Sequence, residues 1–531
     1  MAQRLNINKL FFCHGAELAL LLGLIGLFPA QSFGGESAYE QQVMLARSGN
    51  YQPLLDTLKR QQMQGGLSDE KVADWLQVAS WAGRDEEVVS VWQRYQQRVS
   101  IPSRGIASAA RSYRNLRRWT ESLALWGYRL AFTLNDGLAN VRDLDNIPRL
   151  LISGNPSLKA FASTVTRIQE TEPVRVMHVD LDYVYDSDPA QQTKNIDALV
   201  QRVYDMKISH VFLQAFSDPA GDGNIKSLYF PNRWLPVRAD LFNFVSWQLQ
   251  TRGGVKVYAW LPVLSFDLNA SLPRVERWDT ATRQSRRAHS PYLRLSPWNK
   301  QVRSQIADLY QDLSRYATFD GILFHDDALL TDFEDSSQDA LAAYRRAGFA
   351  QNIADIYGNT AEFQRWTRFK SQTLVGFTRT LTQAVKDIRG PQIKTARNIF
   401  ALPILEPESE AWFAQNFDDF LAAYDWTVPM AMPLMESVPP AESNDWLTQL
   451  IRRVAAKPLA LNKTIFELQA RDWSSKGQKG VADKQLVEWM RLLQLNGVMH
   501  YGYYPDDFIN NQPDISRIRP EFSSWWYPDN D

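Results

Sequence analysis

Short apolar runs alternate with amphipathic stretches from about residue 173 onward. The apolar runs have the length and composition of buried strands and comprise Val174–Leu181, Ser209–Phe216, Val255–Leu264, Phe319–His325, Ile393–Ile399, Trp426–Pro433, Lys463–Leu468 and Gly497–Tyr504. The stretches between them have helical spacing and comprise Gln191–Met206, Asp240–Gln250, Trp298–Tyr316, Glu362–Lys386, Asp445–Ala456 and Ala482–Leu495. This alternation over residues 173–515 predicts an α/β fold of the (β/α)8 type, a TIM-like barrel.

Two helix ends carry local signals that support this assignment. Ser296-Pro297 is typical of an N-cap followed by proline at the first helical position, and Gly497 is typical of a residue that closes a helix. A doubly wound open sheet is the alternative, but no glycine-rich phosphate loop follows any of the runs. A barrel that lacks one helix also fits, because the segment between the sixth and seventh runs is short.

Residues 38–133 show a weak internal repeat with helical spacing. Gly49 and Gly83 lie 34 residues apart, as do Trp92 and Trp126, and Arg117 stands where a third glycine would fall. A period of 34 residues is that of tetratricopeptide repeats, whose paired helices bury their apolar faces by stacking. We therefore expect an all-α repeat domain that binds a partner or a polymer, with an irregular helical bundle as the alternative.

The remaining segments are expected to be non-catalytic. Residues 1–34 have a short basic region, an apolar run and small residues typical of a signal peptide, which predicts export to the periplasm. An uncleaved anchor is the alternative, although His14 and Glu17 interrupt the apolar run. Residues 134–172, punctuated by proline and glycine, are interpreted as a connector and residues 516–531 as a C-terminal tail.

Composition narrows the range of functions. The 58 Lys and Arg residues nearly balance the 59 Asp and Glu residues, which argues against a nucleic-acid partner. The single cysteine, Cys13, lies in the signal segment, so a cysteine nucleophile and a thiolate metal site are excluded. The 18 Trp, 20 Tyr and 26 Phe residues suit stacking against the apolar faces of sugar rings.

The C-terminal ends of the expected strands, where barrel enzymes carry their active sites, are rich in carboxylates. Asp180 and Asp182 end the first strand, and Asp326 and Asp327 end the fourth. Glycoside hydrolysis needs a carboxylic acid that protonates the leaving oxygen, and a second carboxylate or a substrate group that stabilises the cationic centre. These four residues are the candidate catalytic groups. Because consecutive strand residues point to opposite faces, only one of Asp326 and Asp327 should face the cavity unless the strand has already ended.

Polar and aromatic residues near the same ends are the candidate substrate-binding groups. They are His178, Tyr185, Asp218, Tyr229, Trp234, Trp260, His325, Arg397, Glu467, Asp472, Trp473 and Tyr503. His178, His325 and His500 come from separate strands without a short-spaced ligand pair, so neither a metal nor another cofactor is expected. No Gly-x-Ser-x-Gly elbow occurs, which leaves a serine triad without support.

Several long segments resemble one known domain. Arg175–Asp186, Val211–Phe216, Ser227–Arg233, Val255–Val263 and Asp320–Asp327 are similar to the C-terminal glycoside hydrolase domain of the periplasmic poly-β-1,6-N-acetyl-D-glucosamine deacetylase family of biofilm polysaccharide export. The resemblance covers residues 173–515. It implies a TIM-like barrel that binds and cleaves the polymer after partial deacetylation, with the acid in the Asp326-Asp327 pair.

The region before the barrel departs from that family. Where the family has a metal-dependent deacetylase, this chain has repeats, and none of its six histidines forms a His-x-x-x-His pair, so deacetylase activity is not expected. The repeats resemble, more weakly, the periplasmic tetratricopeptide region of the outer-membrane porin that exports the same polymer. This resemblance implies the polymer and other export-machinery proteins as partners, and it is compatible with association with the outer membrane.

Four functions can be compared on this basis. An endo-acting hydrolase of partly deacetylated poly-N-acetylglucosamine fits the Asp326-Asp327 pair best. A non-catalytic polysaccharide-binding scaffold would need only stacking aromatics. Deacetylation lacks its metal ligands, and hydrolysis of another glycan such as peptidoglycan would not exploit an acidic groove that favours free amines. Whether hydrolysis would retain or invert configuration depends on a distance between carboxylates that the sequence does not give.

Overall fold

The computed structural model describes residues 38–98, 100–118, 121–122, 124–125, 173–289, 292–473 and 479–522. The predicted signal peptide (1–34) and connector (134–172) lie outside the described residues, so both stay predictions. None of the described helices combines the length and the apolar character needed to cross a bilayer.

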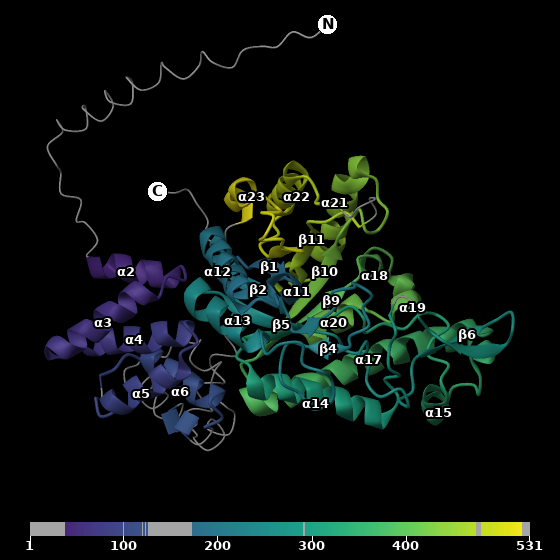
Figure 1. The fold of residues 1–531 in the computed structure, drawn as a ribbon. Helices are drawn as coiled ribbons and strands as arrows, with labels where there is room; N and C mark the ends of the chain where they lie inside the picture. The colour runs from purple at the N-terminus through teal and green to yellow at the C-terminus, as the bar shows by residue number, and fades with distance from the viewer. Residues whose placement is uncertain are drawn as a thin grey trace, which may run out of the picture.

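Within these residues, eight parallel strands close into a barrel, which confirms the predicted fold class (Figure 1). They are β1 (Arg175–Val179), β2 (His210–Gln214), β5 (Lys256–Leu261), β8 (Gly321–Phe324), β9 (Lys394–Ile399), β10 (Trp426–Ala431), β11 (Phe466–Gln469) and β12 (Tyr501–Tyr504). Neighbouring strands follow chain order, and β12 pairs with β1 to complete the ring. Because helices cover the outside and side chains fill the inside, nearly every strand residue is buried.

The helices of the barrel lie where the spacing of apolar residues predicts them. They are α12 (Pro189–Met206), α13 (Phe242–Gln248) with the π-helix η2 (Leu249–Gly253), α14 (Lys300–Tyr316), α17 (Thr360–Arg389), α21 (Ser443–Ala455) and α22 (Asp483–Leu495). Three short helices that were not predicted fill the space between β9 and β10: α18 (Leu402–Leu405), α19 (Glu410–Phe413) and α20 (Phe417–Ala423). Each is too short to show a helical period in the sequence.

Two predictions, the start of the helix after Ser296 and the C-terminal tail, differ from the structure. The N-cap of α14 is Asn299, whose side chain accepts a hydrogen bond from the Val302 amide, whereas Ser296 donates to Asp335. The predicted tail contains a helix, α23 (Ile515–Phe522), that packs against α22 and buries Ile518. Gly497 does close α22, with a φ of 77° that a left-handed helix end requires.

Loops at the carboxyl ends of the strands carry further elements. These are α11 (Leu181–Val184), the β3–β4 hairpin (Phe216–Ser217 and Ser227–Leu228), the β6–β7 hairpin (Glu276–Asp279 and Gln284–Arg287), α15 (Gln338–Arg346) and α16 (Ile353–Tyr357). The 3-10 turns η3 (Pro407–Ser409), η4 (Pro440–Glu442) and η5 (Ala460–Lys463) connect other elements. The β6–β7 hairpin and α15 lie at the far edge of the barrel from the N-terminal helices (Figure 1).

The described part of the N-terminal region is all-helical, as expected. It contains α2 (Ala38–Arg47), α3 (Gln52–Gly65), α4 (Asp69–Trp81), α5 (Asp85–Tyr95) and α6 (Ser103–Asn115). Gly49, Gly83 and Arg117 follow a helix and have φ values of 104°, 68° and 61°. The three positions spaced by 34 residues therefore share a positive φ, including the one that lacks glycine.

The N-terminal helices pack against α12, α13 and η2 of the barrel. Trp247 of α13 lies in the same buried cluster as the apolar residues of α3 to α6. The fully buried guanidinium of Arg252 contacts Asp197 of α12 at 2.7 Å, the Tyr51 hydroxyl at 2.7 Å and the Arg47 carbonyl at 2.8 Å. The helices and the barrel thus share an apolar and a polar contact.

Candidate active site

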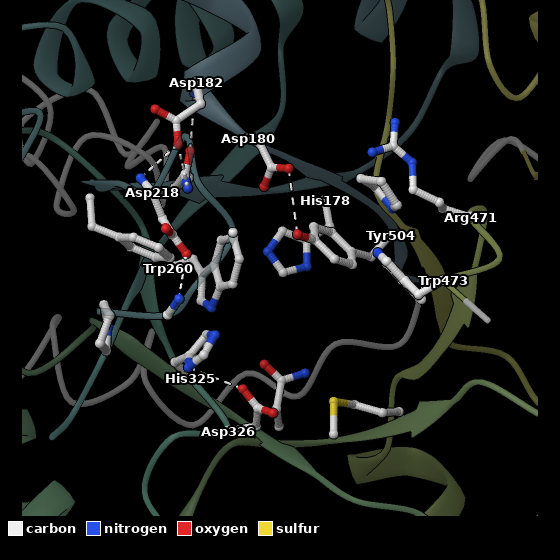
Figure 2. Close-up of a pocket in the computed structure, with 18 of the residues that line it drawn as sticks. His178, Asp180, Asp182, Asp218, Trp260, His325, Asp326, Arg471, Trp473 and Tyr504 are labelled. Carbon is white, nitrogen blue, oxygen red and sulfur yellow. Dashed lines mark hydrogen bonds and ion pairs between the residues drawn. The ribbon is translucent and has the colours of Figure 1, made fainter. Parts of the chain in front are cut away.

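A cavity of about 620 Å³ opens at the carboxyl ends of the barrel strands (Figure 2). Each of the eight barrel strands contributes a lining residue, either from within the strand or from the position directly after it: His178, Gln214, Trp260, His325, Asn398, Met430, Glu467 and Tyr504. Among the residues that the structure describes, five carboxyl groups line the cavity, those of Asp180, Asp182, Asp218, Asp326 and Glu467, against one arginine, Arg471. The cavity therefore carries an excess of acidic groups and favours cationic ligands.

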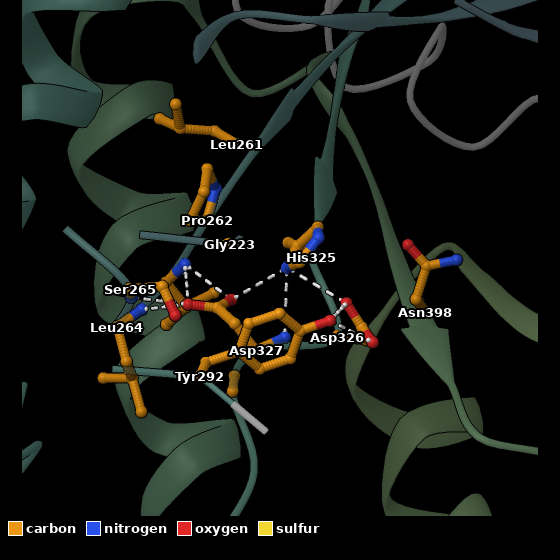
Figure 3. Close-up of polar contacts among 12 residues, drawn as sticks. Gly223, Leu261, Pro262, Leu264, Ser265, Tyr292, His325, Asp326, Asp327 and Asn398 are labelled. Carbon is orange, nitrogen blue, oxygen red and sulfur yellow. Dashed lines mark hydrogen bonds and ion pairs between the residues drawn. The ribbon is translucent and has the colours of Figure 1, made fainter. Parts of the chain in front are cut away.

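Asp326 lies in the cavity wall just after β8. Its carboxylate lies 3.0 Å from Nδ1 of His325 and accepts the hydroxyl of Tyr292 at 2.9 and 3.0 Å (Figure 3). Burial raises the pKa of Asp326, and the neighbouring charge of Asp327 adds to the shift. Burial alone would lower the pKa of His325, yet the charges of Asp326 and Asp327 outweigh it and raise that pKa. Asp326 therefore has the raised pKa that a general acid needs.

Asp327 faces away from the cavity and is fully buried. Its carboxylate accepts hydrogen bonds from the amides of Val263, Leu264 and Ser265 at 2.6 to 3.2 Å. Burial alone would raise the pKa of Asp327, but the contacts with His325 and these amides lower it overall. Asp327 is thus an anchor for the segment after β5 rather than a group that can meet substrate.

Asp180 lies at the end of β1 with one oxygen 3.4 Å from the hydroxyl of Tyr504, while its Oδ1 has no partner among the described residues. Burial raises its pKa to about 7, and the charge of Asp182 contributes. Trp473 stacks on the ring of Tyr504 with centroids 5.8 Å apart. Asp180 therefore faces the cavity beside two aromatic rings.

Asp182 is occupied by structural contacts. Its carboxylate accepts from Tyr229, Arg238 and Ser217 at 2.6, 2.9 and 3.1 Å, and from the Asp218 amide at 2.8 Å. Asp218 in turn accepts from the amides of its own loop. Asp182 thus holds the β3–β4 hairpin at the cavity rim.

The floor of the cavity is a polar pair packed among rings. Nδ1 of His178 lies 2.7 Å from Glu467, whose second oxygen accepts from Asn398 at 2.9 Å. The indole of Trp260 lies edge-on to His178, with centroids 4.3 Å apart, and 5.2 Å from the ring of His325. With an exposed fraction of 6%, Trp260 forms the floor and not an open stacking wall.

The structure brings many of the predicted site residues together. The cavity is lined by His178, Asp180, Asp182, Asp218, Trp260, His325, Asp326, Glu467 and Trp473. Tyr185, Asp327, Asp472 and Trp234 lie outside its lining, and Trp234 donates to Asp308 of α14 instead.

Three predictions of substrate contact are corrected. Tyr229 is fully buried, with its hydroxyl on Asp182. Arg397 and Tyr503 point out of the barrel, where Arg397 donates to Tyr424 and Tyr503 to Asp506. Because side chains alternate along a strand, the neighbouring residues Asn398 and Tyr504 line the cavity in place of Arg397 and Tyr503.

Tyr292 and Arg471 were missed by sequence reasoning. Both come from loops without periodicity, and nothing in the local sequence places Tyr292 beside Asp326. In the ranges that the structure describes, no group of three or more His, Cys, Asp or Glu residues could hold a metal ion.

The barrel and its acidic cavity define a glycoside hydrolase-like domain. Residues 178–504 match the model described as Hypothetical glycosyl hydrolase family 13 (GHL13), and the chain belongs to this family.

Two curated relatives confirm the two resemblances. The chain is 55% identical over 412 residues to the poly-beta-1,6-N-acetyl-D-glucosamine N-deacetylase of Escherichia coli (strain K12), which covers 77% of this chain and 61% of that protein. It thus spans less than two thirds of that relative. The N-terminal segment is similar to the poly-beta-1,6-N-acetyl-D-glucosamine export protein of the same organism, at 39% identity over 107 residues, or 20% of this chain and 13% of that protein.

A solved structure is similar to the barrel. It is the glycoside hydrolase domain of PgaB (BpsB) from Bordetella bronchiseptica, with a TM-score of 0.62 and 45% identity, covering 66% of this chain and 99% of that one.

Proposed function

We propose that the chain is an endo-acting hydrolase of partly deacetylated poly-β-1,6-N-acetyl-D-glucosamine that acts in the periplasm, during export or turnover of biofilm polysaccharide. The observation that carries this proposal is Asp326, a carboxyl group in the cavity wall whose pKa burial raises. A raised pKa keeps a carboxyl group protonated over a wider pH range, and the protonated form can donate to the leaving glycosidic oxygen.

The charge of the cavity supports a substrate with free amines. Asp180, Asp218 and Glu467 face the same space as Asp326, and an ammonium group would compensate their charges. Asp180 is the best partner for that ammonium, because one of its oxygens has no partner among the described residues. Trp473 and Tyr504 offer a stacked pair of rings at the rim for a sugar face.

The relatives support the choice of polymer. Both curated relatives have names that refer to poly-beta-1,6-N-acetyl-D-glucosamine, one as its N-deacetylase and the other as its export protein. We infer that the N-terminal helices hold the polymer or another protein of the export machinery next to the barrel. The contacts of Arg252 and Trp247 would then fix where the polymer is presented.

Product analysis by mass spectrometry tests the proposal. The chain is incubated with partly deacetylated and with fully acetylated polymer, beside Asp326→Asn and Asp327→Asn variants. Short oligosaccharides from the partly deacetylated polymer, absent with Asp326→Asn, are the expected result. Intact polymer that co-purifies with the wild-type protein would instead favour the alternative, a non-catalytic polysaccharide-binding scaffold.

A further inference from the structure

Tyr292 is held beside the proposed acid by contacts around its ring. Its hydroxyl donates to the Asp326 carboxylate, and its ring lies edge-on to His325 with centroids 5.4 Å apart (Figure 3). Gly223 approaches it closely, since an added Cβ there would lie 2.5 Å from Cδ1 of Tyr292. Because Tyr292 belongs to the segment between β7 and α14, the position of its hydroxyl depends on what fixes its backbone.

Arg294 fixes that backbone from outside the cavity. Its guanidinium is fully buried, and Nε donates to the Tyr292 carbonyl at 3.3 Å. Nη1 donates to the Leu329 carbonyl at 2.6 Å, and both terminal nitrogens lie 3.0 Å from the Glu334 carboxylate. One planar fork thus ties the segment that carries Tyr292 to the loop that follows Asp326.

Lys370 of α17 holds the same loop at two further points. Its Nζ donates to the carbonyls of Thr331 and Glu334 at 2.7 and 2.9 Å. Glu334 also accepts the Thr331 amide at 2.9 Å, so the loop is closed on itself. Lys370 is fully buried, and this burial lowers its pKa to about 7.

A contribution to stability is a weak explanation for the buried ion pair between Arg294 and Glu334. Well-packed apolar side chains of similar volume are often as stable as a buried ion pair, because desolvation offsets the attraction between the charges. What an arginine adds is geometry, since its donors have fixed directions and hold several acceptors at once. The position of Tyr292 is the property that this geometry determines.

We propose that Arg294 is a positioning residue that sets the hydrogen bond between Tyr292 and Asp326. The inference rests on the proposed function, because Asp326 is the acid of that reaction. A hydrogen bond from Tyr292 favours the charged form of Asp326, so its loss raises the pKa of Asp326 and moves the alkaline limit of hydrolysis to higher pH. The other charged groups beside Asp326 are His325 and Asp327. They contact each other, and Asp327 is held by the amides of residues 263–265, so these contacts run through groups other than Arg294.

Three variants of the full chain test the inference. Arg294→Lys keeps a charge opposite Glu334 but removes the fork, and Tyr292→Phe removes the hydroxyl. Arg252→Lys is the matched control, because Arg252 is equally buried and paired but lies at the contact with the N-terminal helices. Hydrolysis is measured against pH, thermal unfolding is followed for each variant, and crystal structures are determined.

Arg294→Lys and Tyr292→Phe should each lower kcat/KM about 10- to 100-fold. Each should also shift the alkaline limb of the pH–rate profile, where hydrolysis falls off at high pH, upward by about one pH unit. This is the size expected for the loss of a hydrogen bond to a charged group. The double variant should show no larger shift. Arg252→Lys should lower Tm and leave the alkaline limb of the pH–rate profile unchanged.

An unchanged alkaline limb in Arg294→Lys would reduce Arg294 to a structural role and overturn the inference. So would a crystal structure of that variant in which the Tyr292 hydroxyl still contacts Asp326. If the wild-type chain fails to cleave the polymer, the proposed function fails, and the crystal structure alone decides the inference. If Arg294→Lys does not fold, the apolar pair Arg294→Met with Glu334→Met replaces it in both measurements.

Discussion

The carboxyl groups of Asp326 and Asp327 follow each other at the end of β8 and have opposite environments. That of Asp326 lines the cavity with a raised pKa, whereas that of Asp327 is surrounded by backbone amides that lower its pKa. These adjacent carboxyl groups thus differ in their surroundings, because at the end of β8 one side chain points into the cavity and the other points toward the backbone after β5. Of these two residues, only Asp326 lines the cavity.

Substitution at these two positions should have different consequences. Asp326→Asn should lower the rate of polymer cleavage by about 10²- to 10⁴-fold with little change in stability, because it removes a proton donor. Asp327→Asn should destabilise the fold by about 1.5–3 kcal/mol, because it weakens charge-assisted hydrogen bonds to Val263, Leu264 and Ser265. Product analysis and urea unfolding separate the two effects. Equal loss of cleavage at equal stability in both variants would contradict the assignment.

Binding of amine-containing oligosaccharides should depend on pH through Asp180. Its pKa is raised to about 7, so the group is neutral below that pH and charged above it. Affinity for a cationic glucosamine oligomer should therefore weaken as the pH falls through about 7. Calorimetric titration of Asp326→Asn with the oligomer between pH 5.5 and 8.5 measures this without turnover. Adding Asp180→Asn should flatten the dependence of affinity on pH. If affinity still weakens as the pH falls through about 7, another group is responsible.

Two glycines of the cavity loop form a matched pair for testing the position of Tyr292. Gly221 and Gly223 have φ values of 64° and 66°, so alanine costs about 1–2 kcal/mol of backbone strain at either position. Only at Gly223 would the new Cβ meet the Tyr292 ring, while at Gly221 it meets nothing within 4 Å. Gly223→Ala should thus lower cleavage about 10- to 100-fold more than Gly221→Ala. Equal activities at equal Tm would argue against a role for Tyr292.

Two tryptophans of the predicted site should differ in their effect on polymer affinity. Trp473 lines the cavity beside Tyr504, and Trp234 is 44% exposed outside the cavity lining. Trp473→Ala should weaken binding by about 0.5–1.5 kcal/mol, up to roughly tenfold in Kd. Trp234→Ala should leave it unchanged. Titration of labelled oligosaccharide measures both, and the reverse order would place the polymer across the β4–α13 loop instead.

The barrel could be predicted because its signals are local. Each strand is an apolar run between turns, and each long helix repeats its apolar residues with helical spacing, so order and approximate bounds follow from the sequence alone. The helices α18 to α20 could not be predicted in this way. Their positions depend on tertiary packing, because α18 packs against α21, whereas α19 and α20 pack against α17.

The site could be predicted to the correct strand ends but not to the correct faces. Asp326, Asn398 and Tyr504 line the cavity, while Asp327, Arg397 and Tyr503 beside them in the sequence do not. A shift of one residue reverses the direction of a strand side chain, and the bounds of a strand are not known that accurately from its sequence. Tyr292 depends on a contact with Asp326 across 34 positions, which no local pattern encodes.

The contact between Trp247 and the N-terminal helices has a practical consequence for dissecting the chain. Trp247 is 3% exposed within the apolar cluster of those helices, and Gln248 donates to the Trp81 carbonyl. A barrel expressed alone would present this indole and the unpaired amide to water, and such a surface promotes self-association. Biochemists who wish to study the barrel in isolation should therefore replace Trp247 with a polar side chain before concluding that the fragment is insoluble.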